Sequence, residues 1–199
     1  MTQTPPLLRE TPAQTSGPYL HIGCLPVTNG LSHVYDTPLP IEAAHAGAKG
    51  EWITLQGSVF DGAGDVLLDA MLESWQADAA GLYPGQAGAD PALSGFARFA
   101  SDGETGAFSM RTIKPGATQG PDGARYAPHL ALWIVARGIT AGLNTRIYFA
   151  DADNADDPVL SQIADPARAQ TLLAQPLGEG VYRFDIHLQG ENETVFLDI

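Results

Sequence analysis

The segment 127–138, APHLALWIVARG, constrains the fold of this chain more than any other stretch, because its side chains alternate as in a β-strand. One face is apolar throughout and predicts a core-facing surface, made of Pro128, Leu130, Leu132, Ile134 and Ala136. The opposite face combines His129, a candidate metal ligand, with Ala131, Trp133, Val135 and Arg137. This second face is therefore a candidate metal site, a degenerate one, or part of a neighbouring chain's site.

The rest of the chain predicts a mainly-β fold. Runs rich in β-formers are separated by Gly, Pro and Asp turns, with a hairpin turn at 61–64. Besides the opening segment, strands are predicted at 52–60, 69–78, 96–99, 106–113, 144–149, 181–188 and 193–196. Asp157-Pro158 and Asp165-Pro166 each place a capping residue before a proline, and the second predicts a short helix over 167–175 with Leu172 and Leu173 turned inward. The pattern predicts a β-sandwich or barrel with one or two short helices.

The first fifty residues contain many turn formers and little periodicity. Pro12 and Pro18 fix the backbone locally, so we expect an ordered, extended N-terminal arm over 1–50 and a β-sandwich over 51–199. No internal repeat or composition shift divides the 199 residues, which predicts a single domain.

Charge and cysteine content exclude several classes of function. A net charge of −13 argues against binding to nucleic acids or anionic membranes, which require a basic face. A single cysteine, Cys24, excludes an internal disulfide framework, and neither a secretory signal nor a long apolar run is recognisable. We therefore expect a cytoplasmic protein.

Several segments, in order along nearly the whole chain, resemble the intradiol ring-cleavage dioxygenase family. They are 10–23 (ETPAQTSGPYLHIG), 69–83 (DAMLESWQADAAGLY), 112–116 (TIKPG), 127–138, 145–151 (TRIYFAD), 157–160 (DPVL) and 182–196 (YRFDIHLQGENETVF). The resemblance implies a β-sandwich and, in catalytic chains, an Fe(III) ion held by two tyrosines and two histidines. Phenolate is a hard anionic donor suited to Fe(III), and imidazole completes the coordination shell.

This sequence departs from the family pattern at the metal positions. The resemblance places Tyr83 at the first tyrosine ligand and His129 at the first histidine of a His-x-His pair. Ala131 takes the place of the second histidine, and Thr118 lies where the second tyrosine is expected. We therefore expect no iron and no catalytic residue in this chain, and favour a hydrogen-bonded pair in a filled pocket over metal ligation by His129 and Tyr83.

The same departures resemble the non-catalytic α chains of two-chain family members. That resemblance implies a homologous, iron-binding β chain as partner, a higher-order α–β assembly, and protocatechuate and O₂ as substrates. It also implies that the arm and one cation border the partner's iron pocket, through Thr15, Gly17, Pro18, Tyr19 and Arg137. Since a strand advances about 3.3 Å per residue, Arg137 is expected roughly 26 Å from His129, too far to share one small pocket.

Other interpretations remain open from the sequence. Arg137 is equally compatible with a plain surface or interface ion pair. The chain is also compatible with a self-sufficient intradiol dioxygenase that has rearranged ligands, or with a β-sandwich binding or structural module without an active site. Iron in the purified chain would favour the first of these, and loss of dioxygenase activity when the chain is omitted from the assembly would exclude the second.

Overall fold

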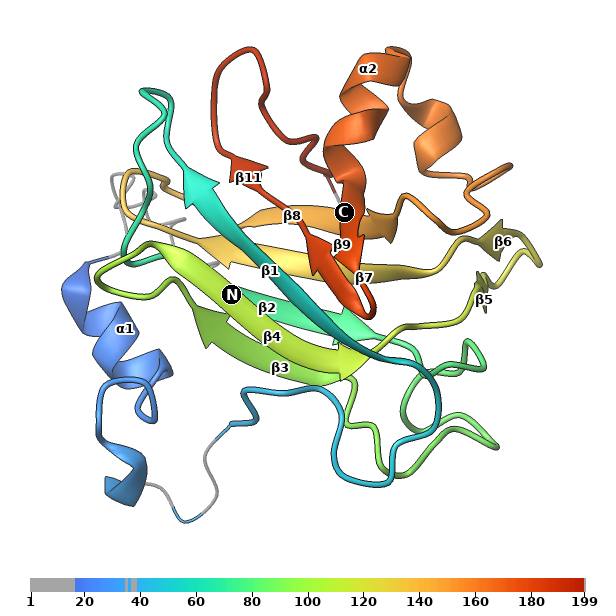
Figure 1. Ribbon diagram of the computed structural model, residues 1–199, viewed down its shortest axis with the longest axis horizontal. Coiled ribbons are helices and arrows are strands. Elements are labelled where there is room, and N and C mark those ends of the chain that lie inside the picture. Colours follow the sequence, from blue (N-terminus) through green and yellow to red (C-terminus); the bar gives the residue numbers. More distant parts are fainter. Residues whose placement is uncertain (1–16, 35, 37–38, 199) are drawn as a thin grey trace, which may run out of the picture.

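Figure 1 shows the computed structural model of the chain, which describes residues 17–34, 36 and 39–198. The predicted bend at Thr11-Pro12 and the candidate residue Thr15 lie outside the described residues. The strands are β1 (Trp52–Phe60), β2 (Met71–Gln76), β3 (Phe96–Ala100), β4 (Ala107–Ile113), β5 (Thr118–Gln119), β6 (Arg125–Tyr126), β7 (His129–Val135), β8 (Leu143–Phe149), β9 (Leu173–Gly178), β10 (Val181–Arg183) and β11 (Ile186–His187). The helices are α1 (Pro18–Cys24) and α2 (Pro166–Ala169), with 3-10 turns η1 (Ser32–Val34), η2 (Leu160–Gln162) and η3 (Gln170–Leu172). The predicted mainly-β fold is confirmed.

The strands form two layers that face each other. In the order of pairing, β11, β1, β10, β9, β8, β7, β2 and β3 follow one another, and β4 pairs with the other edge of β1. Strand β9 joins the layers, because it pairs with β10 in antiparallel and with β8 in parallel orientation. In Figure 1, β1 and β4 cross in front of the layer that contains β7, β2 and β3. The small β5–β6 hairpin lies at one end and α1 at the opposite end.

Alternating side chains from both layers form the main core between them. It includes Leu55 and Val59 of β1, Phe108 and Met110 of β4, and Leu130, Leu132 and Ile134 of β7. The apolar face predicted for the opening segment is therefore confirmed for Leu130, Leu132, Ile134 and Ala136, which are all buried. Burial of apolar surface at about 25 cal/mol per Å² is the main force that holds the two layers together.

Three polar contacts also link β2 in one layer to β4 in the other. The Thr112 hydroxyl donates to Gln76 Oε1 at 2.7 Å, and Gln76 Nε2 donates to the Ile113 carbonyl at 2.8 Å. The Ser74 hydroxyl contacts the Met110 sulfur at 3.2 Å. Because buried polar groups are costly when unpaired, these contacts favour one register of the two layers.

The predicted turn at 61–64 exists, but it does not connect a pair of adjacent strands. Gly64 N donates to the Asp61 carbonyl at 3.1 Å, and a single bridge joins Phe60 to Val66. Strand β1 then pairs with β4, whereas β2 pairs with β3 and β7. The chain therefore crosses from one layer to the other after this turn.

The predicted strand over 181–188 is interrupted, and the reason lies in its neighbour β1. Asp185 Oδ1 accepts a hydrogen bond from Ser58 N at 3.1 Å, so a side chain replaces a backbone ladder partner. The backbone of Phe184 approaches so closely that a Cβ on Gly57 would lie 1.8 Å from its carbonyl oxygen. This crossing divides the strand into β10 and β11.

The helix predicted over 167–175 is shorter than expected. Asp165 does cap it, since its carboxylate accepts from Ala167 N at 2.9 Å. Helix α2 ends at Ala169, however, and Leu173 already begins β9. Pairing of β9 with strands on both sides outweighs the local helix propensity of this stretch. Leu172 is fully buried as predicted, and Leu173 is only partly buried.

Two further predictions are corrected by the structure. Residues 193–196 do not form a strand, because Thr194 N donates to His187 O and Val195 N donates to the Thr171 hydroxyl, two different segments. Residues 18–24 are helical rather than extended, since Pro18 occupies the first helical position, where no N–H is needed. Among the described residues, no helix is long and apolar enough to cross a membrane.

Candidate functional site at the two ends of strand β7

The register around β7 places chemically important side chains in rows on the outer face of its layer. His129 lies opposite Tyr148 of β8. Two residues further on, Ala131 lies between Arg146 of β8 and Trp75 of β2. A strand alternates its faces, so these side chains share one surface. This surface contains the positions that the resemblance assigns to the lost metal site.

The structure brings the four degenerate metal positions into one region. Tyr83 stacks on Trp75, the neighbour of Ala131, with ring centroids 6.1 Å apart. Thr118 pairs with Tyr126, whose ring centroid lies 6.3 Å from that of His129. We call Tyr83, Thr118, His129 and Ala131 the degenerate site.

Close backbone contact joins the segments that carry Tyr83 and Thr118. Gly116 N donates to the Asp78 carbonyl at 2.8 Å. Gly81 has a φ of +80°, and a Cβ there would lie 1.9 Å from the Ala117 carbonyl oxygen. The Asp78 carboxylate accepts from the backbone N–H groups of Ala80, Leu82 and Asp90, which shapes the loop around Tyr83. Glycine at 81 is therefore required for the two segments to meet.

His129 is a buried, neutral imidazole. Its Nδ1 lies 2.7 Å from the Ala127 carbonyl oxygen, which can only accept, so Nδ1 donates and Nε2 keeps its lone pair. Burial lowers the pKa of His129, and the positive charge of Arg146 lowers it further, against the opposing effects of the Ala127 carbonyl and Asp157. One imidazole donor of the family pattern is therefore preserved.

Asp157 holds two neighbours of His129 in place, the Ala127 backbone and the Tyr148 side chain. Its side chain is 1% exposed, and Oδ2 accepts from Ala127 N at 2.8 Å. Oδ1 accepts from the Tyr148 hydroxyl at 3.0 Å and from the backbone N–H groups of Val159 and Leu160. Asp157 thus accepts from the backbone as a capping residue does, but the 3-10 turn η2 begins only at Leu160, with Val159 and not Asp157 as its N-cap. The Asp157 carboxylate also connects β8 to the start of β7. Burial raises the pKa of Tyr148, so its hydroxyl stays protonated as a donor.

Arg146 is a member of this region that sequence reasoning missed. Its Nη1 donates to the Tyr148 hydroxyl at 3.3 Å, and its guanidinium carbon lies 5.2 Å from the centroid of the Tyr126 ring. Its Nε is buried without a hydrogen-bond partner. The only sequence signal is a charge within TRIYF, and its position next to Ala131 depends on a strand register that the sequence does not display.

The residues present do not fit the Fe(III) centre that the resemblance implies for catalytic chains. Ala131 offers no donor, Thr118 offers at best a neutral hydroxyl, and the cationic Arg146 lies beside Ala131. Across the described residues, no group of three or more His, Cys, Asp or Glu side chains is arranged to hold a metal ion. We therefore derive no chemical step through iron in this chain.

The opposite end of β7 has a different character. Arg137 follows the strand, and its side chain is 72% exposed. Its Nε donates to Asp69 Oδ2 at 2.9 Å, and Nη2 contacts the same oxygen. The two residues border a hollow that the loops around Val66, Leu68 and Ile139 line with apolar side chains. The structure thus supplies the ion pair that the sequence left open, on the edge of a solvent-accessible depression.

Three other candidate pocket residues that the structure describes, Gly17, Pro18 and Tyr19, lie on or beside α1, near the same end. Gly17 precedes the helix and accepts a hydrogen bond from Leu20 N at 3.0 Å. Pro18 begins the helix, and Tyr19 is 84% exposed. Leu20 packs in a cluster with Met71 and Val135, two residues before Arg137. The structure therefore places α1 beside the strand end that carries Arg137 and leaves Tyr19 available for contact.

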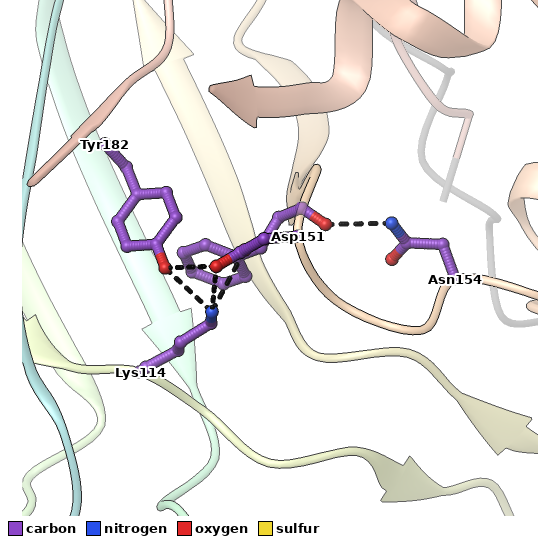
Figure 2. A network of polar contacts seen from close by, with 5 residues as sticks. Lys114, Asp151, Asn154 and Tyr182 are labelled. Carbon is purple, nitrogen blue, oxygen red and sulfur yellow. Dashed lines mark hydrogen bonds and ion pairs between the residues drawn. The ribbon is translucent and has the colours of Figure 1, made fainter. Parts of the chain in front are cut away.

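A second polar network strengthens the end of the sandwich that contains His129. Figure 2 shows Lys114 and Tyr182 converging on the Asp151 carboxylate. Lys114 Nζ lies 3.0 Å from both carboxylate oxygens and 2.8 Å from the Tyr182 hydroxyl, which donates to Asp151 at 2.8 Å. Although burial opposes it, these contacts raise the pKa of Lys114 and lower that of Asp151. Lys114 follows β4, Asp151 follows β8 and Tyr182 lies in β10, so the network links three strands.

Comparison with known proteins defines the class to which this fold and site belong. A family model described as Dioxygenase matches residues 36–190. The solved structure of catechol 1,2-dioxygenase from Pseudomonas arvilla C-1 superposes with a TM-score of 0.60 at 22% identity, over 78% of this chain and 59% of that one. The chain belongs to the dioxygenase family, as its resemblance to the intradiol ring-cleavage enzymes predicted.

Two curated relatives narrow the comparison. The protocatechuate 3,4-dioxygenase alpha chain of Pseudomonas putida is 43% identical over 197 residues, which cover 96% of this chain and 98% of the relative. The beta chain of the corresponding enzyme from Burkholderia cepacia is 32% identical over 159 residues, which cover 73% of this chain and 67% of that one. The chain is thus similar to both types of subunit, and along nearly its whole length to an alpha chain.

Proposed function

We propose that this chain is the α subunit of a protocatechuate 3,4-dioxygenase that works with a homologous, iron-bearing β chain. The assembled enzyme would open the ring of protocatechuate between its two hydroxylated carbons and insert both atoms of O₂, giving 3-carboxy-cis,cis-muconate. The observation that carries this proposal is the 43% identity to an alpha chain over 96% of the sequence. The similarity to a beta chain supports a partner of the same fold.

We propose further that Fe(III) is bound by the partner and that this chain holds none. Ala131 and Thr118 supply no metal donor comparable to imidazole or phenolate. Asp157, Tyr148 and Arg146 meanwhile form a hydrogen-bonded arrangement beside His129. These features support a structural role for the degenerate site.

We propose that this chain contributes to catalysis by lining the partner's substrate pocket at the subunit interface. The residues that would do so are Thr15, Gly17, Pro18, Tyr19 and Arg137. An arginine beside the partner's pocket would offset the charge of the substrate carboxylate through charge-assisted hydrogen bonds. The exposure of Tyr19 and of the Arg137 guanidinium supports this role, and so does the packing of α1 next to the end of β7.

The surface of the N-terminal segment supports a subunit interface. Several large apolar side chains between residues 17 and 41 are exposed in the single chain, namely Tyr19, Ile22, Val34, Leu39 and Ile41. Obligate subunit interfaces bury large apolar surfaces. The proposal includes one domain, because Ala44 and Ala48 pack against Leu93 and Ile113 of the sandwich. It also includes a cytoplasmic location, which the single free thiol of Cys24 supports.

Co-expression tests the proposal. This chain and a homologous β-type chain from the same organism are purified alone and together, and O₂ uptake with protocatechuate, molecular mass and iron content are measured. We expect activity only from the complex and iron only in the β-type chain. Stoichiometric iron with a tyrosinate-to-iron absorption band in this chain alone would identify a self-sufficient dioxygenase. Full activity of the β-type chain alone would leave this chain a structural module.

A further inference from the structure

The strongest unexplained feature outside the proposed partner contacts is Arg146, a half-buried cation on the surface that carries the degenerate site. Its guanidinium is held by the Tyr148 hydroxyl on one side and by the face of the Tyr126 ring on the other. His129 adjoins both of these rings, with centroid distances of 5.6 Å to Tyr148 and 6.3 Å to Tyr126. The guanidinium therefore lies within the aromatic surroundings of the one preserved imidazole.

The register explains why a cation can be accommodated there. Arg146 is the direct cross-strand neighbour of Ala131, and a methyl group leaves space that an imidazole at this position would fill. Cross-strand neighbours lie with Cβ atoms about 4.5–5.5 Å apart, within easy reach of a long side chain. The loss of the second histidine and the presence of Arg146 are therefore structurally linked.

We infer that Arg146 replaces the metal ion: its guanidinium supplies the positive charge at the degenerate site and excludes a metal cation from it. The inference rests on the proposal that this chain holds no iron. It adds a second reason why the degenerate site would not bind a metal, besides the missing donors. Two like charges separated by a few ångströms in a partly buried site repel strongly. The contacts with Tyr126 and Tyr148 fix the guanidinium in place, because arginine stacks on aromatic faces and donates in its own plane.

This inference makes a prediction that the loss of donors alone does not make. If only the second histidine were missing, Ala131→His would restore metal binding by itself, because His129 retains an Nε2 lone pair. If the Arg146 guanidinium occupies the place of the metal in the degenerate site, the Ala131→His variant will bind metal poorly until Arg146 is also replaced. Arg146→Gln is the appropriate second change, since glutamine removes the charge and can still donate to Tyr148.

The experiment titrates the full-length chain with Zn²⁺ by calorimetry, with the wild type as the background for binding to its acidic surface. We expect Ala131→His with Arg146→Gln to bind Zn²⁺ at least about tenfold more tightly than Ala131→His alone. Ala131→His with Arg125→Gln is the matched control, since it makes the same change in net charge at an arginine whose side chain is 46% exposed. That control should bind no better than Ala131→His.

Each outcome of the Zn²⁺ titrations either supports or overturns the inference. Equal Zn²⁺ affinity of Ala131→His and the Arg146→Gln double variant overturns the inference, and so does a double variant that binds no more tightly than the wild type. Arg146→Met in the Ala131→His background provides a second neutral side chain of similar length if the glutamine variant does not fold. Iron in the wild-type chain would contradict the proposed function as well as the inference, whereas the variant affinities test the inference alone, so the two failures are distinguishable.

Discussion

The two ends of β7 differ in how their charged side chains are buried and paired. At the His129 end, the Asp157 carboxylate is 1% exposed and accepts hydrogen bonds from three backbone N–H groups and the Tyr148 hydroxyl. At the other end, the Arg137 guanidinium is 72% exposed and pairs with Asp69 beside an apolar hollow. A buried, fully paired charge stabilises one conformation, whereas an exposed charge remains available to a partner. We therefore propose that the end that resembles a metal site is structural, and that the opposite end is the candidate for function.

Removing the Asp157 carboxylate tests the structural half of this comparison and should give the largest effect. Asp157→Ala leaves the Tyr148 hydroxyl and several backbone N–H groups without their acceptor. Buried donors that lose a charged partner cost about 1–3 kcal/mol each when they cannot reach water, so we expect a loss of roughly 3 kcal/mol or more in the free energy of unfolding. Urea denaturation of the full-length chain measures it.

The control for this variant is Asp153→Ala in the same acidic loop. Asp153 is exposed and contacts Arg125 across 3.5 Å, so its loss should change stability by no more than about 0.5 kcal/mol. Similar stabilities of the two variants would mean that the buried network does not hold this end of the sandwich.

Removing the Arg137 guanidinium tests the functional half. In the α–β complex, Arg137→Ala should lower kcat/KM for protocatechuate by about tenfold or more, chiefly through KM, because a charge-assisted hydrogen bond contributes about 1.5–3 kcal/mol. Iron content and molecular mass should stay unchanged. Arg183→Ala is the matched control, because Arg183 of β10 is also exposed and is paired with Asp185. Unchanged kinetics with normal assembly would show that Arg137 forms only a surface ion pair with Asp69 and has no role in catalysis.

Asp69 should affect the same kinetics less strongly, through Arg137. Its Oδ2 accepts from the guanidinium, and exposed ion pairs contribute at most about 1 kcal/mol, so we expect Asp69→Asn to lower kcat/KM by roughly two- to fivefold. The effect should disappear in the Arg137→Ala background. A double-mutant cycle measures this coupling, and additive effects would show that Asp69 acts independently of Arg137.

Much of the sandwich was predictable because its strands alternate polar and apolar residues. Strands β1, β2, β3, β4, β7 and β8 all lie within predicted segments or within one residue of them. The errors occur where distant contacts decide the structure. Leu173 leaves the helical pattern because β9 has strands on both sides, and Asp185 interrupts a strand by bonding to Ser58. Neither contact leaves a local signal.

The same limit applies to the candidate site. His129 could be singled out as a candidate ligand on its strand, Ala131 only through the resemblance to the family's His-x-His pair, and the Asp157 cap from the following proline. The second role of Asp157, as acceptor for Ala127 and Tyr148, and the position of Arg146 both depend on the pairing of β7 with β8. A close pair on one strand is visible in a sequence, whereas a neighbour across the sheet requires the register.

The Lys114–Asp151–Tyr182 network should give the smallest effect, visible as a difference in the pH dependence of stability. The pKa of Asp151 is lowered on folding, so its contribution is present above its ordinary value of 3.8 and is lost as pH falls through the lower folded value. Lys114 has a raised pKa and stays charged throughout this range. The stability difference between wild type and Asp151→Asn should therefore be below about 1 kcal/mol at neutral pH, since Asp151 is partly exposed, and should vanish in strong acid. Urea titrations of both proteins at neutral and acidic pH measure it, and a difference that grows on acidification would show that the lysine does not hold the carboxylate ionised.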